Sequence, residues 1–370
     1  MRGEEQLKPY MLDLTELPQH DSGADTLGTK LGDIIKADTI SLGQLAGRAI
    51  AIDAYNTLYA FLSTIRQPDG TPLMDRKGRV TSHLSGLFYR NLNLIENGVR
   101  PVYVFDGTPP VLKAGEIQRR REIRDAAFEA WQQAKEEGRV EDARKAAQAS
   151  SRLTSEMVDE SKKLISSLGI PIVQAPSEGE AAAAQMAREG VVWASASQDN
   201  DSLLYDCPRM IRNLTISGRR RMARSKAYKT IEPELIDLDL NLKLLGITRE
   251  QLIDVAILVG TDYNPGMKGI GQRTALKLVL KYGALEKIVA ETDTKLDFPF
   301  QEIRSIFLNP PKLDLVAPKW STLEPEQVVK TLCDDHDFSM ERVQGSIKKL
   351  LEHMEETLGT TEQRSLTDYF

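Results

Sequence analysis

The sequence AIAID at residues 49–53 is a short apolar run that ends in an aspartate. Two further segments share this form, VYVFD at 102–106 and VVWASASQD at 191–199. Apolar runs of this length are typical of parallel strands that are buried on both faces of a sheet. Helix-like segments separate the runs, so the sequence predicts an α/β fold with a mostly parallel central sheet.

Acidic residues gather where such a sheet would place a site. Open α/β sheets bind ligands outside the carboxyl ends of their strands. Seven acids stand at expected element ends in apolar surroundings: Asp53, Asp106, Glu178, Glu180, Asp199, Asp201 and Asp262. Bringing several carboxylates together is costly unless cations neutralise them, because like charges raise one another's pKa. The set therefore predicts a cation site.

The residue types in this set indicate which cation would bind. Cys207 and Cys333 stand far apart and the four histidines are scattered, which argues against zinc. Magnesium and manganese prefer carboxylate oxygens. Two such ions, ~3.5–4 Å apart, stabilise the attacking and leaving oxygens of a phosphodiester displacement. The acids thus favour a magnesium-dependent nuclease.

Local alternatives exist for two of these groups. In APSEGEAAAAQMA at 175–187, Ser177 and Glu180 form a capping-box pattern, and both glutamates would favour the positive end of a helix dipole. The Asp-Asn-Asp sequence at 199–201, taken alone, is typical of an ordinary turn.

Composition sets the broad class of the protein. The chain has 370 residues, 41% of them hydrophobic, and a net charge of −6 that argues mildly against nucleic acid. Basic blocks offset that average: QRRREIR at 118–124, in a long helical region (111–168) with a turn at Gly138, and GRRRMARSKAYK at 218–229, expected to be a loop. Residues 234–356 are expected to be mainly helical.

Apolar runs such as LIDVAILVG (252–260) fall short of the ~18–20 residues of a membrane span, and a secretory signal is lacking, so we expect a cytoplasmic protein.

Several long motifs resemble one known family. They are IDAYNTLYAFLSTIR (52–66), TSHLSGLFYRN (81–91), PVYVFDGTPP (101–110), GIPIVQAPSEGEAAAA (169–184), ASASQDNDSLL (194–204), ILVGTDYNPGMKGIG (257–271) and FLNPP (307–311). Together they resemble flap endonucleases of the archaeal type, members of the XPG-like structure-specific nucleases, from about residue 28 to 370. The resemblance implies a PIN-like nuclease core that cuts 5′ flap DNA one nucleotide into the downstream duplex, with 5′–3′ exonuclease activity, in Okazaki fragment maturation and base excision repair.

The resemblance also assigns roles around the acids. Asp53, Asp106, Glu178 and Glu180 match the ligands of one Mg²⁺ ion, and Asp199, Asp201 and Asp262 match those of a second, with Glu180 between them; the resemblance allows Mn²⁺ in place of either ion. Lys113 and Arg120 match a basic pair at the base of a helical arch that contacts the scissile phosphate. They are seven residues apart and so share a helix face.

Further matches concern DNA. Arg119, Arg121 and Arg124 would line the arch and guide a single strand, Arg66 would also contact DNA, and Tyr59 would stack on a base, with core packing as its alternative. GMKGIGQRTALKL at 266–278 is a glycine-rich turn before a helix, which can bind phosphate. It matches a helix–two-turn–helix element that grips the duplex through Gly266, Lys268, Gly269, Gly271, Arg273 and Lys277, and that can hold K⁺.

The two ends of the chain lead to separate expectations. Gln363, Leu366, Tyr369 and Phe370 follow the spacing of a peptide that binds the sliding clamp PCNA; a frayed end is the alternative. At the other end the family begins Met-Gly, whereas here LGTKLGDII (27–35) follows 26 further residues. Either translation starts at residue 27 or the extension is real.

These expectations give one domain plan. Residues 1–26 form a poorly ordered extension, 27–356 a single nuclease domain, and 357–370 a flexible tail. Within the domain, 27–125 and 169–262 form the nuclease parts, about 107–168 the arch region, and 263–356 the helix–two-turn–helix and final helices. We expect a monomer.

Two other function classes compete with the nuclease hypothesis. A non-catalytic, clamp-tethered DNA-junction binding protein would have no use for seven mutually repelling carboxylates. A small-molecule magnesium phosphatase would need neither the arch nor the glycine-rich element.

Overall fold

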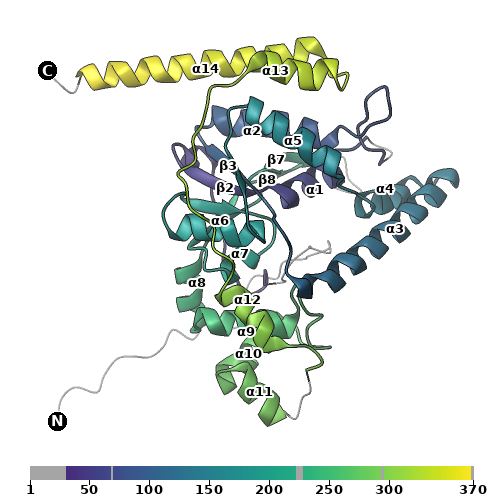
Figure 1. The fold of residues 1–370 in the computed structure, drawn as a ribbon, viewed down its shortest axis with the longest axis vertical. Coiled ribbons are helices and arrows are strands. Elements are labelled where there is room, and N and C mark those ends of the chain that lie inside the picture. The colour runs from purple at the N-terminus through teal and green to yellow at the C-terminus, as the bar shows by residue number, and fades with distance from the viewer. Residues whose placement is uncertain (1–30, 68–69, 222–227, 293–295, 368–370) are drawn as a thin grey trace.

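A seven-stranded sheet lies at the centre of the molecule (Figure 1). The computed structural model describes residues 31–67, 70–221, 228–292 and 296–367, without the side chains of 219–221, 228–229 and 356–367. In spatial order the strands are β1 (Asp38–Thr39), β9 (Glu234–Asp237), β6 (Arg209–Arg212), β5 (Ala194–Ala196), β2 (Ala49–Asp53), β3 (Arg100–Phe105) and β4 (Ile172–Gln174). The five strands from β6 to β4 are parallel, and β9 runs antiparallel to β6 and β1. The predicted mostly parallel α/β sheet is confirmed.

Both faces of the central strands are buried, which explains their apolar sequences. In β2, Ala51 faces one hydrophobic core, while Ile50 and Ile52 face the other. The Ile52 face is covered by α1 (Ala54–Thr64), α2 (Ser82–Glu96) and α5 (Ser155–Ser167), together with the 3₁₀ turn Leu42–Leu45. The Ala51 face is covered by α6 (Gly179–Arg188), α7 (Asp201–Leu204), α8 (Leu238–Leu245) and α9 (Arg249–Val259).

A helical hairpin projects from this body (Figure 1). After a 3₁₀ turn at Val111–Lys113, α3 (Ala114–Glu136) runs outward and α4 (Val140–Ala149) returns. Gly138 has a φ of +69° in the turn between them, as predicted. The returning limb closes onto the body, because a Cβ on Gly70 would lie only 2.9 Å from the Cα of Arg144.

Two expectations about strands need correction. The basic block 218–229 is a hairpin at both of its ends, not a loop: β7 (Gly218–Arg221) pairs with β8 (Tyr228–Ile231). The charge of the block favoured a loop, but its aromatic and β-branched residues after 227 favour a strand. The segment 191–199 is strand only at Ala194–Ala196, so Asp199 lies in the loop that follows.

The C-terminal part is helical apart from β9 and one extended segment. It contains α10 (Gln272–Tyr282), α11 (Leu285–Thr292), α12 (Phe300–Leu308), α13 (Pro325–Val329), a π-helical turn at Lys330–Asp334 and α14 (Met340–Thr367). Residues 309–324 run back along the body, where Trp320 Nε1 donates to the Pro101 carbonyl at 2.9 Å. In Figure 1, α14 extends past the rest of the fold.

Some predictions about the termini lie outside this description. Residues 1–26 and the possible start at residue 27 are not among the described residues, nor are Tyr369 and Phe370. Gln363 and Leu366 fall within α14, but their side chains are not described. A search of the described helices finds none that is long and apolar enough to cross a bilayer.

Candidate active site

The predicted acids meet at the carboxyl ends of the parallel strands. Asp53 is the last residue of β2, and its Oδ1 caps α1 by accepting from the Asn56 backbone N–H at 3.0 Å. Asp106 follows β3 directly, and Asp199 lies three residues beyond β5. Since β3 and β5 flank β2 in the sheet, the fold places these three carboxylates at one edge.

The other four acids come from helices on the Ala51 face of the sheet and their flanking loops. Glu178 and Glu180 stand at the start of α6, and Asp201 opens α7. Asp262 follows α9 by three residues. Short helices thus end or begin at the strand ends that carry the other acids.

Burial and mutual repulsion raise the pKa of most of these groups. Burial, then Asp106, raises the pKa of Asp53 to about 8. The pKa of Glu180 lies well above its ordinary value, first because of burial and then because of Asp201, Asp53 and Asp199. For Asp199 the raised pKa has the same first cause, followed by repulsion from Asp201 and Asp262. Burial also raises the pKa of Glu178, where Lys113 opposes the rise and Asp106 and Asp262 add to it. Glu178 in turn raises the pKa of Asp53.

Two basic side chains reach into this cluster from the base of α3. Lys113 Nζ pairs with Glu178 and lies 3.2 Å from Asp262 Oδ2. Arg120 Nη2 donates to Asp262 Oδ1, and Arg120 Nε donates to Glu116 Oε1 at 2.8 Å. Burial works to lower the pKa of Lys113, but Glu178 and Asp262 more than offset it and raise that pKa. Lys113 from the 3₁₀ turn and Arg120 from α3 both reach Asp262, and they serve as counter-ions to the acids.

The chemistry of the cluster fits a hard divalent cation. Its donors are carboxylates alone, and Glu180 Oε1 is buried without a hydrogen-bond partner among the described groups. Within the described residues, no three His, Cys, Asp or Glu side chains are arranged to hold an ion; Lys113 bridges Glu178 and Asp262 instead. An entering cation would therefore exchange partners with Lys113 and Arg120.

The predicted capping box at Ser177 is wrong. Helix α6 starts at Gly179, one residue later than that pattern predicts, and Ser177 Oγ donates to the Thr108 carbonyl at 3.0 Å. The cap comes from elsewhere in the chain, because Asp106 Oδ1 accepts from the Gly179 N–H at 2.6 Å. A Cβ on Gly179 would lie 2.7 Å from that oxygen, so a side chain here would push the Asp106 carboxylate out of its present position.

Comparisons with known proteins agree with this geometry. A model of the XPG N-terminal domain matches residues 27–127, and one of the XPG I-region matches residues 169–262. Flap endonuclease 1 of Caldivirga maquilingensis is 52% identical over 340 residues, which cover 90% of this chain and 97% of that protein. Flap endonuclease 1 of Pyrococcus furiosus is 51% identical over 346 residues, covering 93% and 99%. The chain belongs to the flap endonuclease 1 family. The structure of flap endonuclease-1 from Methanococcus jannaschii matches with a TM-score of 0.66 at 38% identity, over 89% of this chain and all of that one.

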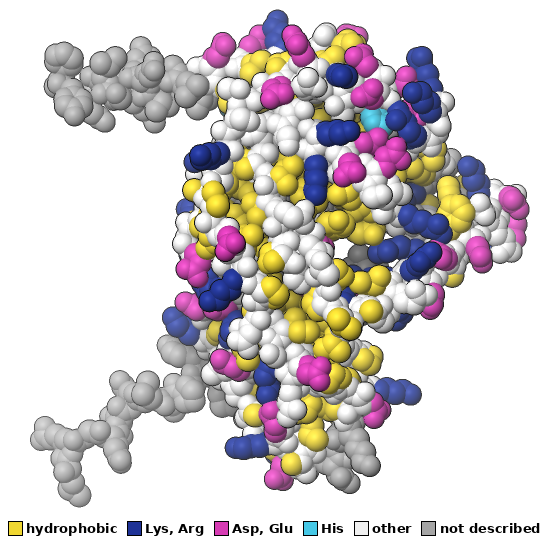
Figure 2. All heavy atoms as spheres, viewed as in Figure 1, with side chains coloured by type: hydrophobic (Ala, Val, Ile, Leu, Met, Phe, Trp, Pro, Cys, Tyr) yellow, Lys and Arg dark blue, Asp and Glu magenta, His cyan; other side chains and the backbone are white. Residues whose placement is uncertain are grey.

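The flap endonuclease family is a family of nucleases, and its predicted DNA contacts can be placed on the fold. Tyr59 is half-buried on α1, with the Arg124 guanidinium 4.6 Å from its ring centroid. Arg119 donates to both Glu116 oxygens, and Arg121 is exposed. Figure 2 shows Lys and Arg side chains interspersed with acidic ones along this projecting hairpin. Contact of these residues with DNA stays a prediction.

Arg66 has a clear role within the protein. Its guanidinium donates to the carbonyls of Leu62 (2.9 Å) and Gly70 (2.8 Å) and to Ser151 Oγ (2.8 Å). These bonds tie the end of α1 to the segment that follows α4. Any DNA contact by Arg66 would have to be made beside these bonds.

The glycine-rich element connects α9 to α10. Gly266 has a φ of +76°, and a Cβ there would lie 2.2 Å from the Val259 carbonyl oxygen. Its close approach is therefore to the protein's own helix, whereas a Cβ on Gly269 or Gly271 would meet nothing within 4 Å. Lys268 and Lys277 are exposed and Arg273 is half-buried. Binding of duplex DNA and of K⁺ by this element stays a prediction.

Three residues beside the carboxylate cluster were not predicted from the sequence. The Tyr205 and Tyr263 hydroxyls are 2.9 Å apart in the buried layer beside Glu178 and Asp201. Asn56 contacts both Asp53 and Asp199. A signal existed for two of the three: Tyr263 adjoins Asp262, and Asn56 stands three residues after Asp53, where an N-cap aspartate finds its donor.

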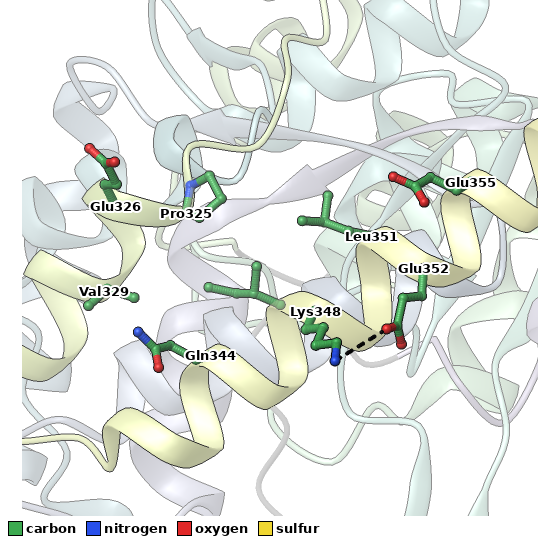
Figure 3. Close-up of a pocket in the computed structure, with 9 residues that line it drawn as sticks. Pro325, Glu326, Val329, Gln344, Lys348, Leu351, Glu352 and Glu355 are labelled. Carbon is green, nitrogen blue, oxygen red and sulfur yellow. Dashed lines mark ion pairs between the residues drawn. The ribbon is translucent and has the colours of Figure 1, made fainter.

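A separate groove lies far from the acids in the fold. It occupies about 500 Å³ between α13 and α14, and Pro325, Val329 and Leu351 are the apolar residues labelled among its lining. Figure 3 shows Glu326 on α13, Glu355 on α14 and the ion pair between Lys348 and Glu352, whose atoms are 3.6 Å apart. None of its lining residues belongs to the carboxylate cluster.

Proposed function

We propose that this chain is a magnesium-dependent, structure-specific 5′ flap endonuclease. It hydrolyses the phosphodiester one nucleotide into the downstream duplex, leaving a 5′-phosphate and a 3′-hydroxyl, and it also has 5′–3′ exonuclease activity. The observation that carries the proposal is the convergence of seven carboxylates with Lys113 and Arg120 at the base of the α3–α4 hairpin. Family membership supports it.

The carboxylates would hold two Mg²⁺ or Mn²⁺ ions. Asp53, Asp106 and Glu178 would hold one, Asp199, Asp201 and Asp262 the other, and Glu180, which is repelled by acids of both groups, would lie between them. When bound, the ions stabilise negative charge on the attacking and leaving oxygens. Burial of the cluster strengthens each of these electrostatic contacts.

Lys113 and Arg120 would act on the phosphate. Their present partners, Glu178 and Asp262, are carboxylates that entering cations would neutralise. The two side chains are then free to contact the scissile phosphate and to stabilise the charge that develops in the transition state. Because both residues lie at the start of α3, their contact with the phosphate would depend on the position of the α3–α4 hairpin.

The substrate would be a branched DNA that is recognised by shape. The α3–α4 hairpin would accommodate the single-stranded flap, with Arg119, Arg121, Arg124 and Tyr59 nearby, and the α9–α10 element would hold the duplex through Lys268 and Lys277. Such phosphate contacts carry no base information, so cleavage depends on structure and not on sequence. This specificity suits lagging-strand and long-patch repair intermediates.

The sliding clamp PCNA is the proposed protein partner. Gln363, Leu366, Tyr369 and Phe370 would dock into the clamp, while the catalytic body remains free to act as a monomer. A chain that ends at residue 362 should keep its basal cleavage and lose stimulation by the clamp. Stimulation of the shortened chain would contradict this assignment.

A double-flap DNA labelled at its 5′ end tests the proposed activity. With Mg²⁺ we expect one product, one nucleotide longer than the flap, and with EDTA none. A single-stranded DNA of the same sequence is the control for structure specificity. Tight binding of the double flap without cleavage in Mg²⁺ would instead support a non-catalytic junction-binding protein.

A further inference from the structure

Asn56 joins two carboxylates of the site that come from different strands. Its side-chain Nδ2 donates to Asp199 Oδ2 at 2.9 Å, and its backbone N–H donates to Asp53 Oδ1 at 3.0 Å. Asp53 ends β2, and Asp199 follows β5, the parallel neighbour of β2. Asn56 itself lies in the first turn of α1, which starts directly after Asp53.

The amide of Asn56 is oriented by a third contact. Its Oδ1 accepts from the Gln198 backbone N–H at 3.2 Å. Because a backbone N–H can only donate, this bond places the oxygen toward Gln198 and the NH₂ group toward Asp199. The donor is thus aimed at the carboxylate by the same loop that carries that carboxylate.

A neutral amide does something that the nearby cations cannot do. Lys113 and Arg120 hold Glu178 and Asp262 as counter-ions, so they compete with an entering cation. Asn56 holds Asp199 through Oδ2 without adding charge to the site. A hydrogen bond of this kind orients a metal ligand and raises its affinity for the ion.

We propose that Asn56 is a positioning residue that fixes the Asp199 carboxylate relative to Asp53, and thereby sets the spacing of the two cation sites. This inference rests on the proposed metal-dependent activity. The bond to Asp53 uses only the backbone N–H, which every residue except proline supplies. The side chain of Asn56 therefore bonds only Asp199 and the Gln198 backbone. Replacing that side chain leaves the hydrogen bond that caps α1 in place, because the backbone N–H makes it.

A titration of the full chain with Mn²⁺ alone tests the proposal directly. The free ion is measured by electron paramagnetic resonance. Asn56→Leu keeps the branched shape and the number of side-chain heavy atoms of asparagine, and Asn56→Ala favours the helix; both remove the amide. We expect either variant to bind Mn²⁺ about 10- to 100-fold more weakly at one site. On double-flap DNA, the Mg²⁺ concentration for half-maximal cleavage should rise by a similar factor, while affinity for the DNA in EDTA stays unchanged.

Asn241→Leu is the matched control. Asn241 is a buried amide on α8 that accepts from the Lys36 N–H at 2.6 Å and donates to the Lys36 carbonyl at 3.0 Å, so it is structural. This variant should lose thermal stability and keep its Mn²⁺ affinity. Unchanged Mn²⁺ affinity in both Asn56 variants, beside normal binding by the parent chain, would overturn the positioning role and leave the proposed function intact. Failure of the parent chain to bind Mn²⁺ would overturn both.

Discussion

Glu180 and Asp199 are the two acids of the site whose pKa lies furthest above its ordinary range, and among the described residues of the site Glu180 is the one with an unpartnered buried oxygen. Asp201, Asp53 and Asp199 all raise its pKa after burial does, and its Oε1 has no hydrogen-bond partner in the described structure. A buried charge in that position lowers the stability of the metal-free fold. Such a cost is typical of a group retained for function and not for stability.

Glu180→Gln should therefore separate stability from activity. Without metal, the neutral isostere should raise the free energy of unfolding at pH 8 by about 1–3 kcal/mol, because it removes the repelled charge. Cleavage in Mg²⁺ should fall on the order of 10³-fold, since the ligand between the two ions is lost. Denaturant unfolding and single-turnover cleavage measure the two effects.

Glu189→Gln supplies the comparison on the same helix. Glu189 lies at the other end of α6, where its side chain is 53% exposed and paired loosely with Arg188 at 3.6 Å. Neither stability nor cleavage should change much in this variant. If Glu180→Gln were as neutral as Glu189→Gln, Glu180 would not belong to the site.

At the scale of elements, the contact between the β3 end and the α6 start holds the site together. Asp106 Oδ1 accepts from the first N–H of α6, so one carboxylate is both a helix cap and a candidate metal ligand. The contact depends on Gly179, whose missing Cβ leaves room for that oxygen. The position of the Asp106 carboxylate in the site therefore depends on the backbone at Gly179.

Gly179→Ala should lower cleavage by about 100-fold, a loss expected when catalytic groups are misplaced by an ångström or so. The added Cβ would lie 2.7 Å from Asp106 Oδ1 and 3.4 Å from the Val104 carbonyl, so Asp106 must move. Circular dichroism should show the helices intact.

Gly345→Ala in α14, where a Cβ meets nothing within 4 Å, should keep full activity and gain up to about 1 kcal/mol of stability. Equal activity in both variants would contradict the role of Gly179.

Sequence reasoning succeeded here where the signal is local. The run AIAID matches β2 residue for residue, and Gly138 marks the turn of the projecting hairpin. It failed where the partner is distant in the chain: the cap of α6 comes from Asp106, 73 residues away, and not from Ser177. The hairpin at 218–231 was missed because its charge outweighed its strand propensity in the prediction.

For the site too, local features could be predicted from the sequence and contacts between distant residues could not. Apolar flanks and expected element ends singled out the seven acids, since both are local features. Spacing could not show that Lys113 pairs with Glu178, 65 residues away, or that Asn56 reaches Asp199, 143 residues away. These contacts follow from the parallel order of β3, β2 and β5, which a single sequence does not specify.

On the scale of the whole molecule, the acid cluster should make stability depend on pH and on metal together. Asp53 has its pKa raised to about 8 in the fold, against an ordinary value near 4. Between these values the native state binds more protons than the unfolded state, so stability falls as pH rises. Burial lowers the pKa of His83, which acts in the opposite direction, but only up to its ordinary pKa of about 6.5. The window from about pH 6.5 to 8 therefore reports on the carboxylates.

The thermal midpoint of the full chain, measured in this window with EDTA and with Mg²⁺, tests the central claim that these carboxylates form a cation site. In EDTA we predict a midpoint that falls as pH rises from 6.5 to 8. In Mg²⁺ we predict a higher midpoint, with a gain that grows with pH, because protons and Mg²⁺ compete for the same oxygens. A midpoint that does not respond to Mg²⁺, or a gain that is equal at both pH values, would contradict the claim.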